Sequence, residues 1–184
     1  VESEGGQQKS NRQQSSRTAL HKAIEEGKID DASRLIAAGA AVNAQDSFGL
    51  PPLHFAVIKG DIPLVKNLVA LKAGVNAHDK RGDTPLHMIA ANHGSVELAR
   101  LMLDAGARPD VANSDGSTPL HWAAGEGNLP LIKLFLANGA DVLDVGDVAL
   151  EQRFIILLER QLPHLFAGGR GGVLDAAVEW GAGA

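Results

Sequence analysis

The stretch Gly82-Asp83-Thr84-Pro85-Leu86-His87 decides the fold, because its pattern returns along most of the chain. The related stretches are Arg17-Thr18-Ala19-Leu20-His21, Leu50-Pro51-Pro52-Leu53-His54 and Ser117-Thr118-Pro119-Leu120-His121. Their histidines follow one another at intervals of 33, 33 and 34 residues. A fixed period of roughly 20 to 50 residues is the signature of a repeat protein. The chain is therefore interpreted as a repeat array before any single residue is given a role.

Apolar residues outside these stretches keep the same period. They form two series with steps of 33, 34 and 33 residues, namely Leu35, Leu68, Met102 and Phe135, and Ile29, Ile62, Val96 and Leu129. Each unit has a short first segment that ends near a glycine. The second segment is longer and has apolar residues three and four positions apart. This arrangement predicts two helices and a turn in every unit.

The pattern resembles the ankyrin repeat, which has a Thr-Pro-Leu-His-x-Ala signature and a period of about 33 residues. The resemblance covers about residues 13–140 and implies an all-α solenoid of helix-turn-helix units joined by β-turn or hairpin loops. The expected repeats span 17–45, 46–78, 79–112 and 113–144. We expect 1–16 to be a disordered leader and 145–166 to be a degenerate fifth repeat that forms an irregular helical cap. A Gly-rich linker and a short C-terminal helix are expected at 167–184.

Three departures from the repeat predict local changes in structure. Pro51 stands where the other units have Thr, so the first helix of the second repeat loses a capping hydroxyl. Lys72 stands where the other units have Gly39, Gly106 and Gly139, which predicts that this corner is either strained, with Lys at positive φ, or rearranged. One extra residue between His87 and Gly94 predicts either a bulged helix or a longer turn.

Composition excludes several classes of function. The net charge of −5 and an aromatic content of 4%, with no Tyr, argue against nucleic acid as a partner. The longest apolar run, 154–158, is too short for a membrane helix. The absence of Cys removes disulfides and thiol catalysis. No signal peptide is visible, and although a start at Val1 leaves a removed N-terminal segment open, we expect a cytoplasmic location.

The histidines of the signature are expected to be structural. Each ring should bond to its own Thr hydroxyl and to neighbouring backbone, because rings one repeat apart cannot converge on a metal ion. No catalytic motif is found, so we expect no enzyme activity, no metal and no cofactor. The residues assigned to the repeat framework are Leu20, His21, Leu53, His54, Thr84, Pro85, His87, Thr118, Pro119 and His121.

The resemblance implies a surface that binds another protein through the concave face and the turn tips. We expect an acidic or hydrogen-bonding feature of the partner opposite Lys80 and Arg81, and apolar groups near Phe48. The candidate contact residues are Phe48, Leu50, Ile58, Lys59, His78, Lys80, Arg81, Asp83, Asn92, His93, Ser114, Asp115, Ser117, Trp122 and Glu126.

Three further roles stay open at this point. As a binding protein, the chain could act in two ways: as an adaptor, or as an inhibitor or protective partner of another protein. The sequence does not separate these two roles. We expect a monomer, but the apolar segment 148–162 also fits a structural homodimer. An enzyme that uses the C-terminal segment 167–184 is the least favoured reading.

Overall fold

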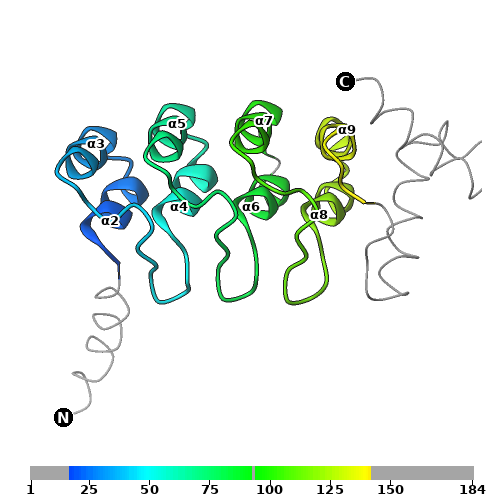
Figure 1. Cartoon of the computed structure of the whole chain (residues 1–184), viewed down its shortest axis with the longest axis horizontal. Coiled ribbons are helices and arrows are strands. Elements are labelled where there is room, and N and C mark those ends of the chain that lie inside the picture. The colour runs from blue at the N-terminus through cyan, green and yellow to red at the C-terminus, as the bar shows by residue number, and fades with distance from the viewer. Residues whose placement is uncertain (1–16, 93, 142–184) are drawn as a thin grey trace, which may run out of the picture.

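A computed structural model describes residues 17–92 and 94–141 of the chain. These residues form eight α-helices, which are α2 (Ala19–Glu25), α3 (Ile29–Ala37), α4 (Pro52–Lys59), α5 (Ile62–Ala70), α6 (Pro85–Ala91), α7 (Val96–Asp104), α8 (Pro119–Gly125) and α9 (Leu129–Ala137). Figure 1 shows them as four pairs side by side, with the loops between pairs projecting to one side. The predicted all-α solenoid of helix-turn-helix units is confirmed. The leader, the helical cap and the Gly-rich segment expected at the two ends lie outside the described residues.

The first helices, α2, α4, α6 and α8, begin at the repeated signature. Thr18, Thr84 and Thr118 adopt an extended conformation at the N-cap, and the His three residues later bonds back to the Thr backbone N–H. Pro at the first helical position costs no hydrogen bond there, because that N–H would have no partner within the helix. The residues of the signature therefore favour the start of a helix at this position.

The core is continuous along the array. The signature leucines Leu20, Leu53, Leu86 and Leu120 are at most 1% exposed, and Leu68, Met102 and Phe135 of the second helices, α5, α7 and α9, are fully buried. Helices of seven to nine residues are too short to be stable alone in water. Each pair is thus stabilised by the apolar surface that it buries against its neighbours.

The extra residue of the third repeat lies in the turn between α6 and α7. Helix α6 has seven residues, as α2 and α8 have, so the helix is not bulged. The chain closes the turn with a hydrogen bond of 2.8 Å from Gly94 N to Ile89 O. A Cβ atom at Gly94 would overlap that carbonyl oxygen, so a glycine is required where the turn ends.

Lys72 has a φ of 63° and is the only non-glycine residue with positive φ in the described part of the chain. Replacing it with Gly is expected to raise the free energy of unfolding by about 1 kcal/mol. The reason is that the Cβ atom of Lys makes the left-handed conformation unfavourable, whereas Gly has no Cβ atom. Urea denaturation measures this change. The control is Lys66→Gly in the exposed interior of α5, which should lower stability by about 1 kcal/mol. A Lys72→Gly midpoint equal to that of the wild type would contradict the prediction.

Candidate functional site

The hairpin tips, residues 46–50, 79–83 and 113–117, share one internal hydrogen-bond pattern. Asp46 Oδ1 accepts from the N–H groups of residues 48 and 50, and Asp79 Oδ1 and Asn113 Oδ1 accept from the equivalent groups of their own tips. A further bond of 2.9 to 3.1 Å joins the first N–H of each tip to its last carbonyl. The acidic and amide side chains at these positions therefore hold the turns.

Each tip also bonds to the next one. Lys80 N donates to Phe48 O at 3.0 Å, and Ser114 N donates to Arg81 O at 2.8 Å. Gly82 has a φ of 81°, and a Cβ atom on it would lie 2.9 Å from Ser114 N. Only glycine allows the neighbouring backbone to come this close. The three tips thus form a ridge along one side of the array.

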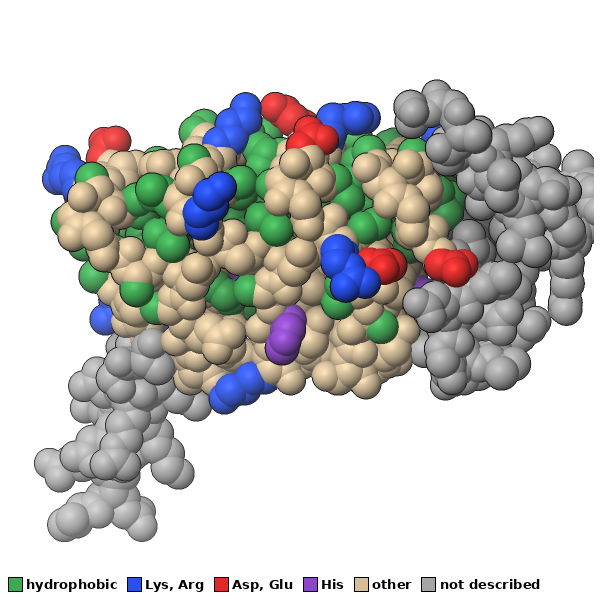
Figure 2. Space-filling view, in the orientation of Figure 1, with side chains coloured by type: hydrophobic (Ala, Val, Ile, Leu, Met, Phe, Trp, Pro, Cys, Tyr) green, Lys and Arg blue, Asp and Glu red, His purple; other side chains and the backbone are tan. Residues whose placement is uncertain are grey.

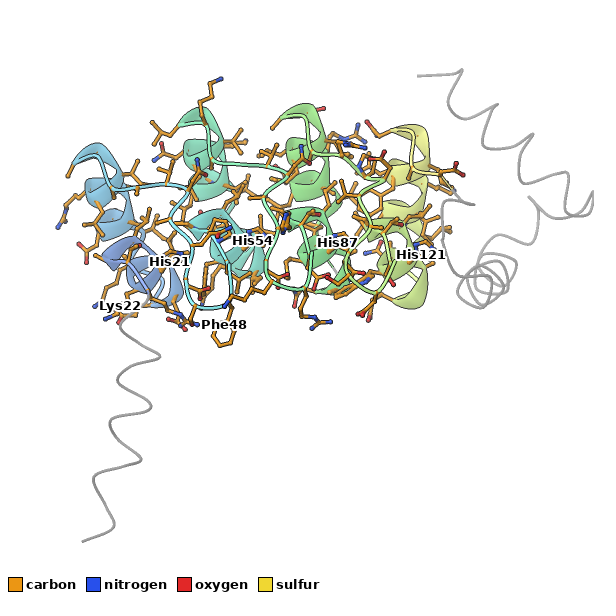
Figure 3. The ribbon with its side chains drawn as sticks, turned by 60° about the horizontal axis from the view of Figure 1, so that its bottom comes forward. His21, Lys22, Phe48, His54, His87 and His121 are labelled. Carbon is orange, nitrogen blue, oxygen red and sulfur yellow. The ribbon has the colours of Figure 1, made fainter. Side chains whose placement is uncertain are left out.

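The first two tips of this ridge carry one exposed apolar and two exposed cationic side chains. Phe48 is 53% exposed, and Figure 3 shows its ring pointing away from the helices. Lys80 and Arg81 are exposed on the adjacent tip. A Cβ atom at Gly49 would lie 3.3 Å from Lys80 Cγ, so the Lys80 stem runs beside the Phe48 tip. Phe48, Lys80 and Arg81 are named the tip patch below.

The charges around the tip patch differ in how far they are neutralised. Arg81 Nε lies 3.7 Å from Asp83 Oδ2, which is a long contact at an exposed guanidinium. The Lys80 ammonium forms no ion pair with any residue of the described ranges. In the first repeat, by contrast, Glu25 pairs with Arg17 at 2.6 Å and Glu26 pairs with Lys28 at 2.8 Å. The tip patch therefore keeps positive charge available to a ligand.

Asp83 does not belong to the exposed surface, and its assignment as a contact residue is corrected. Its side chain is buried, with 1% of the residue exposed, and Oδ1 accepts a hydrogen bond of 2.7 Å from Asn113 Nδ2 of the next tip. Leu50 and Ser117 are only half-buried, but their carbonyl groups accept bonds of 2.9 Å from the rings of His21 and His87. These three residues connect one repeat to the next.

The other predicted contact residues lie along the first helices and on or beside the tips. Ile58 is 44% exposed at the end of α4, and Lys59, Asn92 and Glu126 are exposed at the ends of the first helices. On the ridge itself, His78, Ser114 and Asp115 are exposed. Trp122 is half-buried, and its ring meets that of His87 in a T-shaped arrangement at a centroid distance of 5.8 Å. His93 lies outside the described residues.

The four signature histidines lie in a row along the first helices (Figure 3). In three repeats the Thr backbone N–H donates to His Nδ1 at 3.0 to 3.2 Å, and the Thr hydroxyl lies within 2.7 to 2.9 Å of the same atom. Since Nδ1 accepts, the ring proton is on Nε2. Nε2 of His21, His54 and His87 donates to a carbonyl of the next repeat. These rings join neighbouring units.

Burial lowers the pKa of all four rings below the usual value for histidine. For His21, His54 and His87 the cost of desolvating the imidazolium is partly offset by the hydrogen bond to a carbonyl. For His121 the nearby His87 lowers the pKa further. The rings are therefore neutral at pH 7, as a structural hydrogen-bond bridge requires.

The described residues show neither a metal-ligand cluster nor a helix that could span a membrane. Within 17–92 and 94–141, no group of three His, Asp or Glu side chains is placed to hold a metal ion. No helix of that part of the chain is long and apolar enough to cross a membrane. Figure 2 shows basic and acidic side chains interspersed over one face of the array. What these residues offer chemically is a surface with an apolar and cationic patch on the first two hairpin tips.

Two asparagines that the sequence analysis missed also link the repeats. Asn43 Oδ1 accepts from Gly74 N at 2.8 Å, and Asn76 Oδ1 accepts from Arg108 N at 2.8 Å. Both amides donate to a carbonyl of the next repeat as well, at Lys72 and Gly106. Their separation of 33 residues equals the repeat period, which is the signal that could have revealed them.

Comparison with protein families gives two matches that together cover most of the described residues. A family model described as ankyrin repeats in three copies matches residues 53–145, and one described as ankyrin repeats in many copies matches residues 20–69.

Several curated proteins are similar to this chain. Neurogenic locus notch homolog protein 2 of Homo sapiens is 31% identical over 123 residues, which are 67% of this chain and 5% of that protein. A putative ankyrin repeat-containing protein of Treponema pallidum is 36% identical over 118 residues, 64% of this chain and 40% of that protein. Palmitoyltransferase ZDHHC13 of Mus musculus is 43% identical over 53 residues, 28% of this chain and 8% of the enzyme. The chain thus spans less than half the length of each of these relatives.

Proposed function

The chain belongs to the ankyrin-repeat family, and from this premise we propose that it is a non-catalytic module that binds another protein across the tip patch. Ankyrin repeats are generally protein-interaction modules. The observation that carries the proposal is the exposure of Phe48, 53%, on a tip whose neighbour presents Lys80 and Arg81. Aromatic and Arg side chains dominate the binding energy of protein interfaces.

The chemistry of the tip patch defines the partner segment that fits it. An apolar side chain of the partner would cover Phe48, which is 53% exposed. A carboxylate of the same segment would pair with Lys80 and Arg81. The tips are pre-ordered by the Asp46 and Asp79 turns, so little conformational entropy is lost on binding.

The experiment compares partner capture by three forms of the chain. The test variant is Phe48→Ala, Lys80→Glu, Arg81→Glu. The matched control is Leu71→Ala, Lys66→Glu, Arg100→Glu, which removes one exposed apolar side chain and two exposed cations from the α5 and α7 side of the array. Proteins captured from a native lysate are identified by mass spectrometry, and the affinity of each purified candidate is then measured.

Binding should survive in the control and weaken at least about 30-fold in the test variant, because removal of one interface anchor costs about 2 kcal/mol or more. Equal affinity of all three forms for every captured protein would reject the tip patch as the site. If the partner is an enzyme, its turnover at equimolar concentration separates the two roles. An inhibitor lowers the rate, and an adaptor leaves it unchanged.

A further inference from the structure

The second repeat lacks three stabilising features that the third repeat has. Its N-cap Pro51 has neither a backbone N–H nor a hydroxyl, so the buried His54 Nδ1 has no hydrogen-bond partner among the described residues. In the third repeat, Thr84 supplies both groups to His87, at 3.1 and 2.9 Å. In the second repeat, the turn after the second helix, α5, has Lys72 at a φ of 63°. The third repeat has Gly106 at the equivalent position after α7.

The seam between the second and third repeats has less helix packing than the one that follows it, although Asn76 makes two hydrogen bonds across it. His54 Nε2 donates across this seam at 3.2 Å, whereas His87 Nε2 donates across the next one at 2.9 Å. The helix α7 also packs more closely on α9 than on α5. Within the described chain, the first repeat has only the second as a neighbour, through the packing of α2 on α4.

We propose that residues 17–78, the first and second repeats, open as one unit at this seam while the third and fourth repeats stay folded. Stability in a repeat array is a sum of unit and nearest-neighbour contributions, so a weak inner unit also releases the end unit that depends on it. Cooperative units of this size open below the global unfolding energy when their own stabilisation is low.

The tip patch straddles the seam, which gives the opening a consequence for binding. Phe48 lies on the second repeat and Lys80 and Arg81 on the third, and the hydrogen bond from Lys80 N to Phe48 O crosses between them. A partner that contacts both sides needs the seam closed and holds it closed. This consequence rests on the proposed function; the opening itself does not.

Hydrogen exchange of the free chain, followed peptide by peptide, tests the opening without any partner. Amides of α2 to α5 should exchange with one shared, lower protection than those of α6 to α8. The variant Pro51→Thr, Lys72→Gly should raise protection in α2 to α5 by roughly 30-fold, since it restores the cap and relieves the strained φ. Protection in α6 to α8 should stay unchanged.

A reciprocal variant separates the proposal from a general change in stability. Thr84→Pro, Gly106→Lys places the deficits of the second repeat in the third, and it should lower protection in α6 and α7. Wild-type protection that is uniform over all repeats, or that falls in α2 and α3 alone, would overturn the proposal. So would protection in α4 and α5 that does not respond to Pro51→Thr, Lys72→Gly. None of these results bears on whether the tip patch binds a partner.

Discussion

Replacing His87 with Ala is expected to lower the free energy of unfolding by about 3 kcal/mol. The ring is fully buried, its Nδ1 accepts from Thr84 N, and its Nε2 donates to Ser117 O. Its removal leaves both backbone groups without these partners. It also removes the surface against which the Trp122 ring packs, and the cavity adds to the loss. The largest single-residue effect is therefore predicted at a hydrogen-bond bridge between repeats.

His54→Ala is the matched comparison, because His54 is equally buried but its Nδ1 lone pair, which in His87 is shared by the N–H and hydroxyl of Thr84, has no partner among the described residues. It should cost about 1 kcal/mol less than His87→Ala, which is the typical net value of one hydrogen bond. Urea denaturation of the two variants, followed by circular dichroism, measures the difference. Equal losses would show that the Thr84 bond contributes nothing, and a loss below about 1 kcal/mol for His87→Ala would contradict the bridging role.

Acidification from pH 7 toward pH 5 is expected to destabilise the array steeply. The folded-state pKa of His21, His54, His87 and His121 is lowered by burial, so the unfolded chain binds protons first as the pH falls. Stability is complete above the unfolded-state pKa of about 6.5 and decreases as the pH falls below it. Each ring can contribute up to about 1.4 kcal/mol per pH unit. In His21, His87 and His121, a proton on Nδ1 would also replace the hydrogen bond from the Thr backbone N–H with a repulsive contact between two donors.

The measurement is the free energy of unfolding at several pH values between 7.5 and 5, above the range in which exposed carboxylates titrate. The variant His54→Gln has one titrating ring fewer, so its stability should fall less steeply with pH than that of the wild type. A free energy that is constant from pH 7 to 5 would contradict the neutral, buried state of the rings. Stability that rises on acidification would reverse the assigned direction of the pKa shifts.

The repeat period by itself determined most of the architecture. It predicted the helix pairs, the buried Leu of each signature and, in the three repeats that have the Thr, the bonding of the signature histidine to it. It also predicted the missing cap at Pro51 and a strained or rearranged corner at Lys72, of which the structure shows the strained form. These features depend on contacts within a unit or on a residue's own backbone. The structure at a position in one repeat can therefore be inferred from the residues at the equivalent positions of the other repeats.

The surface was decided by the tertiary structure. Asp83 and Lys80 are both charged hairpin residues, yet Asp83 is buried against Asn113 while Lys80 is exposed beside Phe48. Trp122 packs on a ring in the preceding repeat, and Asn43 bonds to the following one. Each of these outcomes depends on how a neighbouring unit about 30 residues away stacks on its own. Periodicity in the sequence shows which positions repeat, but the stacking geometry selects which side chains a partner can reach.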